Sequence, residues 1–194
     1  TQKSSDEVTE PEQGFAGGSN LTGGFDFTED RYDNGAQTER LSRALFAAGL
    51  ARLGDFSLEA GARHERDDAY GDVTTGQLGL RYAITPAASV FTRGGTAYRA
   101  PTFEERFGGP FNLPSPTLQP ERGHSVEVGG TLLVAGTRNT LSVYRNDVSQ
   151  LINANFSSFP GIYENIPGAR MTGVELQSSA TWLGTDFAAG LSYL

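Results

Sequence analysis

The stretch YRAPTFEERFGGPFNLPSPTLQPER, from Tyr98 to Arg122, interrupts a regular two-residue rhythm that flanks it on both sides. It contains five of the nine prolines in the chain. Proline fixes φ and lacks the N–H that a strand ladder needs, so this stretch is not a central strand, and the proline spacing also argues against a helix. A structureless connection of this length usually has a function. The sequence therefore predicts two arrays of antiparallel strands joined by one large, aromatic-bearing loop.

Composition limits the class of protein. The 194 residues fit one domain, and only the polar, acidic residues 1–17 depart from the rest, which predicts a flexible start. A net charge of −8 argues against nucleic acid as a partner, and the lack of cysteine excludes disulfides and thiolate metal sites. No apolar run approaches the ~20 residues of a membrane helix. A mean hydropathy of −0.36 is nevertheless compatible with a membrane β-barrel, which hides apolar residues in alternate positions.

Alternating apolar and polar residues predict about nine long strands in an all-β, antiparallel, up-and-down meander. The clearest case is Phe56–Glu65, where Phe56 and Leu58 share one face while Ser57 and Glu59 share the other. The alanines of Leu41–Leu53 also fit a helix, but its glycine and the hairpin partner that follows favour a strand. The predicted strand segments are Asn20–Asp30, Leu41–Leu53, Phe56–Glu65, Val73–Ile84, Ser89–Ala97, Ser125–Val134, Thr140–Asp147, Met171–Trp182 and Asp186–Leu194.

Short and long connections alternate along the chain. The short turns are expected at Gly54, Pro86, Gly136 and Gly184, and the long loops after Asp30, after Glu65, at residues 98–123 and at residues 148–169, the last enclosing a small hairpin. This order gathers the short turns at one end of the sheet, as in outer-membrane barrels, whereas a Greek-key sandwich would mix them. Aromatic residues lie beside the short turns, as in an interfacial girdle: Phe56, Tyr82, Trp182 and Phe187. A partial transmembrane β-barrel is therefore favoured over a soluble sandwich.

Five motifs stand in a specific order: YRAPTF at 98–103, LQPER at 118–122, YRNDVSQLI at 144–152, YEN at 163–165 and ARMTGVE at 169–175. With this order and spacing, about half of the chain resembles TonB-dependent outer-membrane receptors, most of all those for vitamin B12 and siderophores. The resemblance implies a barrel of roughly 22 strands, filled by an N-terminal plug and energised through a TonB box. Neither plug nor box is in this sequence, so the chain is expected to be a fragment from the C-terminal part of such a barrel.

The resemblance also implies the function and the surroundings. The expected function is uptake of an iron–siderophore or cobalamin-like ligand across the bacterial outer membrane, with that membrane's lipid and TonB as partners. TonB would act through the missing N-terminal region. A porin-like passive channel is the alternative, and a soluble β-sandwich binding module is a third possibility.

The candidate ligand-binding residues lie in the two long loops, which are expected to be extracellular. They combine aromatic rings with two cations: Arg99, Phe103, Arg106, Phe107, Phe111, Phe156, Phe159 and Tyr163. Aromatic faces and a few convergent charges suit a bulky chelate or corrinoid through stacking and cation–π contact. The alternative is that these residues pin the loops to each other and to the barrel rim.

Other constellations indicate no catalytic, metal or cofactor site. The two histidines, His64 and His124, lack a recognisable serine motif or third partner, so we do not expect an enzyme. Two loops are rich in carboxylates, at Asp67, Asp68 and Asp72, and at Asp26, Glu29, Asp30 and Asp33. Calcium prefers such oxygen ligands, but neither run has the spacing of a known calcium loop. Solvated acidic surfaces are the expected interpretation.

Overall fold

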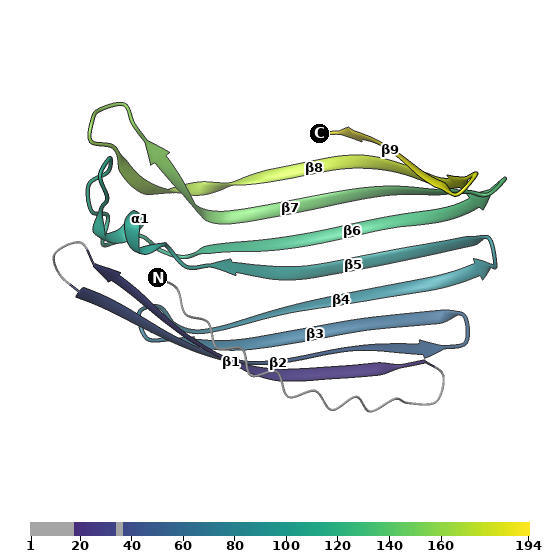
Figure 1. Cartoon of the computed structure of the whole chain (residues 1–194), viewed down its shortest axis with the longest axis horizontal. Helices are drawn as coiled ribbons and strands as arrows, with labels where there is room; N and C mark the ends of the chain where they lie inside the picture. The colour runs from purple at the N-terminus through teal and green to yellow at the C-terminus, as the bar shows by residue number, and fades with distance from the viewer. Residues whose placement is uncertain (1–17, 34–36) are drawn as a thin grey trace.

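The computed structural model describes residues 18–33 and 37–194, which form one antiparallel sheet of nine strands paired in chain order (Figure 1). The strands are β1 (Asn20–Asp33), β2 (Gln37–Leu53), β3 (Phe56–Asp67), β4 (Gly71–Thr85), β5 (Ala88–Arg99), β6 (Glu121–Val134), β7 (Thr137–Asn155), β8 (Ile162–Trp182) and β9 (Thr185–Tyr193). The predicted all-β meander is confirmed. The expected flexibility of residues 1–17 lies outside the described residues.

The tight turns gather at one end of the sheet, on the right in Figure 1. We call this end the turn rim; its connections are Gly54-Asp55, Pro86-Ala87, Ala135-Gly136 and Leu183-Gly184. In the last two turns both central residues have positive φ, between 49° and 78°. Such turns match the twist of the strands they join, so a two-residue connection suffices. The predicted gathering of the short turns is confirmed.

At the opposite end, which we call the loop rim, the strands run further than the sequence predicts. β1 continues to Asp33 and β3 to Asp67, so the expected long loops after Asp30 and Glu65 are largely strand. The predicted long connection at 148–169 is wrong, because β7 and β8 stay paired through it and only residues 156–161 join them. The small hairpin expected inside it is confirmed, since Ile152 pairs with Asn165 and Asn155 with Ile162. The register of β7 and β8 is the same on both sides of Gln150: Ser149 pairs with Gly168 and Leu151 with Ile166. Gln150 faces Pro167, which has no N–H to give to the ladder.

The region around 98–123 does form a long connection, from the end of β5 at Arg99 to the start of β6 at Glu121. The expectation that it contains no helix is wrong, because α1 (Phe103–Phe107) forms in it. Thr102 caps the helix: it accepts a hydrogen bond from the Glu105 amide, and Glu105 in turn accepts one from the Thr102 amide. The helix has only five residues, so it fits between Pro101 and Pro110, with Thr102 as its N-cap. Among the described residues, no helix is long and apolar enough to cross a bilayer.

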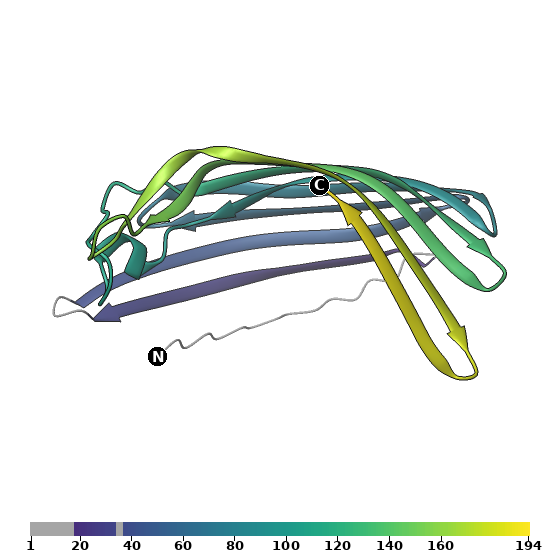
Figure 2. The same ribbon diagram turned by 90° about the horizontal axis from the view of Figure 1, so that it is seen from above.

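The sheet is curved (Figure 2), and its two faces differ in the side chains that they carry. Large apolar side chains project from the convex face, where Leu58, Leu80, Leu176 and Leu191 are 38%, 41%, 41% and 72% exposed. The described residues place no second sheet or helix over this face. A soluble sandwich would have buried these leucines between two layers. The sandwich alternative is therefore excluded.

The concave face is polar. Side chains from alternate strands meet across it: Arg63 of β3 forms an ion pair with Asp26 of β1, although β2 lies between them. On adjacent strands, Arg93 of β5 pairs with its direct neighbour Glu127 of β6, at 2.6 Å. Buried apolar side chains are few, and include Ala44 and Leu118. The loop between β5 and β6 folds towards this face, so the candidate site lies at the concave side of the loop rim (Figure 2).

Candidate functional site

Helix α1 rests on residues that β1 and β2 supply from the far side of the sheet. The ring of Phe103 stacks on Tyr32, with centroids 5.7 Å apart, and the Arg40 guanidinium lies 5.3 Å from the Phe103 centroid. The Tyr32 hydroxyl donates a hydrogen bond to the Gly108 carbonyl at 2.8 Å. Arg40 donates to the Pro101 carbonyl at 3.1 Å. The two strands thus hold both ends of the helix.

The acidic residues beneath this contact are structural. Asp67 is only 3% exposed and accepts hydrogen bonds from the amides of Ala69 and Tyr70, which closes the turn between β3 and β4. Its other neighbour is Arg40, whose guanidinium lies 3.7 Å from Asp67 and 2.8 Å from Asp30. The expected solvated surface is therefore wrong for Asp67, which is buried. Within the described residues, no three such side chains gather in a geometry that suits a metal ion.

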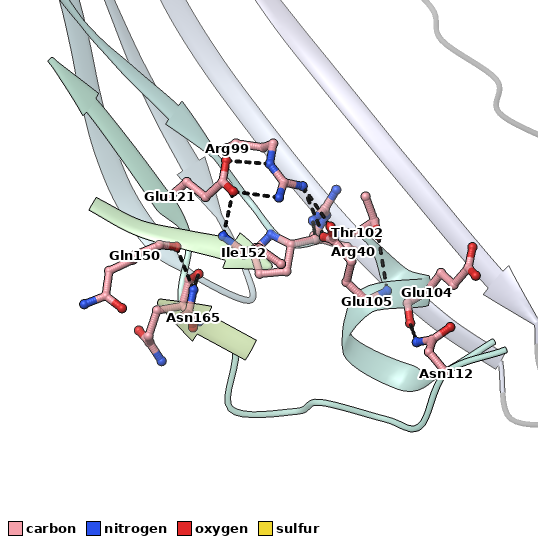
Figure 3. A network of polar contacts seen from close by, with 12 residues as sticks. Arg40, Arg99, Thr102, Glu104, Glu105, Asn112, Glu121, Gln150, Ile152 and Asn165 are labelled. Atoms are coloured by element: carbon pink, nitrogen blue, oxygen red, sulfur yellow. Dashed lines mark hydrogen bonds and ion pairs between the residues drawn. The ribbon is translucent and has the colours of Figure 1, made fainter. Parts of the chain in front are cut away.

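An arginine between two glutamates fixes the base of the loop (Figure 3). Arg99 donates two hydrogen bonds to Glu121, at 2.7 and 2.9 Å, and its remaining nitrogen lies 3.1 Å from Glu105 of α1. Glu121 also accepts a hydrogen bond from the Ile152 amide of β7 at 2.8 Å. A bidentate arginine–carboxylate pair has a defined geometry. The pair therefore couples the two strands that flank the loop to the helix and to β7.

Two asparagines hold the rest of the loop (Figure 3). Asn165 of β8 donates to the carbonyls of Gln119 and Gln150, at 2.9 and 2.7 Å, and accepts from the Gln119 amide at 2.7 Å. Asn112 is buried and donates to the Glu104 carbonyl at 2.9 Å. Side-chain amides can replace missing backbone partners in this way. The LQPER and YEN motifs are thus explained by a framework that orders the loop.

Arg106 lies in an aromatic environment. Its guanidinium is 5.2 Å from the Tyr70 ring centroid and 5.3 Å from that of Phe107, and Phe107 is stacked near Phe103. Burial raises the pKa of Tyr70, and the Arg106 charge partly opposes that rise. Three buried polar atoms have no hydrogen-bond partner among the described residues: the Tyr70 hydroxyl, Arg106 Nε and Ser115 Oγ. These atoms are enclosed by the packing around the loop, where an unpaired polar group is costly.

The outermost part of the loop rim presents exposed phenylalanines. Phe111, Phe156 and Phe159 are 63%, 56% and 77% exposed. The ring centroids of Phe111 and Phe159 lie 6.5 Å apart. Those of Phe156 and Tyr163 are also 6.5 Å apart, and these two rings meet edge-on. Backbone hydrogen bonds of Gly161 with Phe111 and Leu113, both 2.8 Å, join the loop to the β7–β8 hairpin. Two distant segments therefore share one aromatic surface.

Comparison with known proteins assigns the family. The chain matches the family described as "TonB dependent receptor-like, beta-barrel" over residues 4–194. It belongs to that family. Among curated relatives, the vitamin B12 transporter BtuB of Photobacterium profundum is 29% identical over 189 residues, which cover 91% of this chain and 29% of the relative.

Solved TonB-dependent receptors share the fold. The ferric enterobactin receptor PfeA of Pseudomonas aeruginosa aligns with a TM-score of 0.73 at 19% identity, over 91% of this chain and 32% of the receptor. The siderophore receptor PirA of the same organism aligns with a TM-score of 0.74 at 18% identity, over 90% of this chain and 37% of the receptor. The chain therefore spans about a third of the length of these proteins. Its open nine-stranded sheet is a partial TonB-dependent receptor barrel.

The structure of this barrel segment divides the eight predicted site residues into two groups. Four of them hold the loop: Arg99, Phe103, Arg106 and Phe107. Four lie on the shared aromatic surface: Phe111, Phe156, Phe159 and Tyr163. Sequence reasoning missed Tyr32, Arg40 and Tyr70. Their only signal was position, since all three lie near predicted loops on the same side as Phe103.

Proposed function

We propose that this chain forms part of the barrel wall of an outer-membrane receptor that imports an iron–siderophore or a cobalamin-like compound. The observation that carries the proposal is the pairing of an uncovered apolar convex face with an aromatic surface at one rim. The relatives are named as a transporter and as receptors, for vitamin B12, for ferric enterobactin and for siderophores. In this proposal TonB supplies energy through a plug region of the full-length receptor.

Membrane placement follows from the convex face. Strands β1 to β8 exceed the ~9–11 residues that cross a bilayer at a tilt, and their outward side chains form a continuous apolar band. Aromatic rings line the turn rim, where Phe56 and Tyr82 lie 4.7 Å apart and Trp182 is 67% exposed. Amphipathic rings favour the boundary between lipid and water. The turn rim then marks one membrane interface.

The ligand surface is proposed to be Phe111, Phe156, Phe159 and Tyr163. The first three rings are exposed, and they are held in place by the loop framework, so little conformational freedom is lost on binding. Aromatic faces suit a bulky chelate or corrinoid because such ligands present large planar or aromatic surfaces. Arg99, Phe103, Arg106 and Phe107 contribute by fixing the loop.

Binding to the purified full-length receptor in detergent tests this proposal, with ferric enterobactin and cyanocobalamin as the two probes. Phe159→Ala is expected to weaken binding of the recognised probe on the order of tenfold, because a central aromatic anchor is lost. Phe187→Ala, which removes an exposed ring at the turn rim, is the matched control and leaves affinity unchanged. Unchanged binding in the triple variant Phe111→Ala/Phe156→Ala/Phe159→Ala would contradict the proposed ligand surface.

Uptake separates active transport from the passive-channel alternative. Cells that express the full-length receptor should accumulate the recognised probe only while TonB is present. Accumulation at the same rate in cells lacking TonB would identify a passive channel. The phenylalanine variants should then change uptake little, because a channel does not rely on a tight binding surface.

A further inference from the structure

Three arginines in the loop-rim half of the concave face each lie between two carboxylates. The guanidinium of Arg40, for example, is 2.8 Å from Asp30 and 3.7 Å from Asp67. Each set holds two negative charges and one positive charge, so each leaves a net negative charge on this face. The three sets are Arg40 with Asp30 and Asp67, Arg63 with Asp26 and Glu65, and Arg99 with Glu105 and Glu121.

The two segments that carry the aromatic surface add to this negative charge. Residues 100–120 and 151–169 contain a single cationic side chain, Arg106, and three carboxylates. Two of these carboxylates, Glu104 and Glu164, are exposed and form no ion pair within the part of the chain that the structure describes. The rings at the loop rim are therefore presented among uncompensated carboxylates.

Both arginines beside the aromatic surface are already engaged. Arg99 donates two hydrogen bonds to Glu121, and another of its nitrogens lies 3.1 Å from Glu105. Arg106 is half-buried, with its guanidinium 5.2 Å from the Tyr70 ring centroid and its Nε enclosed. An anionic ligand would have to break a bidentate ion pair or withdraw Arg106 from its packing. The surface thus offers rings to a ligand without offering cations.

We propose that the ligand bound by the aromatic surface has no net negative charge. A ferric tris-catecholate is strongly anionic, because each catecholate is a dianion, whereas a ferric tris-hydroxamate is neutral. Cyanocobalamin is neutral as well. Exposed rings in a negative field bind the neutral ligands through apolar and stacking contact and repel the tris-catecholate.

The inference rests on the proposed function and narrows its ligand to a neutral ferric chelate or a neutral corrinoid. PfeA, which is named as a ferric enterobactin receptor, shares the fold of this chain at 19% identity. A shared fold leaves the charge of the loops free to differ, because the ligand is recognised by the site and not by the barrel. The charge at the loop rim therefore separates two ligand classes that the fold leaves open.

Binding to the full-length receptor in detergent tests the charge of the ligand with three probes: cyanocobalamin, the neutral ferric hydroxamate ferrichrome, and the tris-catecholate ferric enterobactin. One neutral probe is expected to bind, and which one binds distinguishes the corrinoid from the chelate. Its affinity should change less than about twofold between low and high salt, because it makes no charge–charge contact. Ferric enterobactin should bind more than about tenfold more weakly at low salt. An affinity for ferric enterobactin within about tenfold of that for the preferred neutral probe, or above it, overturns the inference.

A charge variant tests the cause of this selectivity. Glu104→Gln/Glu164→Gln removes both exposed carboxylates and keeps the acceptor that Glu164 offers to the Asn155 amide at 3.2 Å. Affinity for ferric enterobactin is expected to rise about tenfold at low salt and less at high salt, while affinity for the neutral probe stays within about twofold. Asp55→Asn/Asp186→Asn, at exposed positions of the turn rim, is the matched control and should change neither affinity. A Glu104→Gln/Glu164→Gln receptor that binds ferric enterobactin no better than the wild type overturns the inference.

The outcomes separate this inference from the proposed function. If ferric enterobactin binds most tightly and Phe159→Ala weakens that binding, the aromatic surface binds the ligand and only the inferred charge is wrong. If none of the three probes binds, the proposed ligand classes fail and the inference fails with them. If Glu104→Gln/Glu164→Gln loses the neutral probe, the two single variants replace it, each with an expected rise of about threefold in affinity for ferric enterobactin, and no rise in either overturns the inference.

Discussion

The two rims of this sheet are built in different ways. At the turn rim, two-residue connections close each hairpin through local features, such as positive φ at Ala135 and Gly136 and the hydrogen bond from the Ala87 amide to the Thr85 hydroxyl. At the loop rim, the connection of residues 100–120 is ordered by side chains such as Arg99 and Asn165, which contact several other elements. The first design is local and the second is long-range. A substitution at the turn rim should therefore affect one hairpin, whereas one at the loop rim should spread through the framework.

The largest effect is expected at Gly168 of β8, near the loop rim. Gly168 has a φ of 142°, and an added Cβ would overlap the carbonyl oxygen of Val148. Gly168→Ala should therefore lower the free energy of unfolding by about 3 kcal/mol or more. Gly136→Ala is the matched control at the turn rim: its φ is 78°, but open space surrounds the new methyl group, so a cost of about 1 kcal/mol is expected. Urea unfolding of the full-length receptor in micelles compares the two, and equal losses would contradict the difference between the rims.

A smaller effect, but a wider one, is expected from Asn165→Ala. The substitution removes two hydrogen bonds to loop carbonyls and one from the Gln119 amide. At about 1 kcal/mol per bond with partial replacement by water, the Gln119 amide should exchange with solvent about tenfold faster. Hydrogen exchange read by mass spectrometry over residues 100–120 measures this change. Asn153→Ala, at an exposed position on β7, should leave exchange in that loop unaltered; identical profiles for both variants would show that the clamp does not order the loop.

The smallest effect is expected from Ala135→Asn, which creates an Asn-Gly pair at the turn rim. Ala135 has a φ of 49°, a conformation that asparagine tolerates better than alanine. The free energy of unfolding should rise by about 0.5 kcal/mol, with no change in exchange at the loop rim. Urea unfolding and hydrogen exchange on the same samples check both parts. A change in loop exchange would mean that the two rims communicate.

Sequence reasoning succeeded where structure is local. Alternation in Phe56–Glu65 and the glycines of the turn rim predicted the strands, their order and the side on which the short turns lie. It failed where partners are distant in the chain. The sequence predicted a connection at 148–169 with a small hairpin inside it, but β7 and β8 keep one register through the whole segment, with Gly168 paired to Ser149. The periodicity of the segment gives no signal for this continuous pairing.

The candidate site was predicted only in part, because some of its contacts also join residues that are distant in the chain. The sequence placed its aromatic residues in long loops, and the structure brings Phe111 beside Phe159. Whether a given ring is exposed or packed depends on contacts that cross the sheet. Phe103 is packed because Tyr32 and Arg40, which lie far earlier in the chain, are beneath it. Neighbouring residues in the sequence do not encode that contact.

The loop between β5 and β6 touches both sides of the curved wall. It meets Tyr32 and Arg40 from the first two strands, and Gly161 and Asn165 from the hairpin of β7 and β8. The loop therefore bridges the concave side of the sheet and connects strands that lie far apart along the curve. Because the strand ladders fix the spacing of the wall, trimming this single segment would remove contacts at both sides of the arc at once and leave the pairing of the strands unchanged.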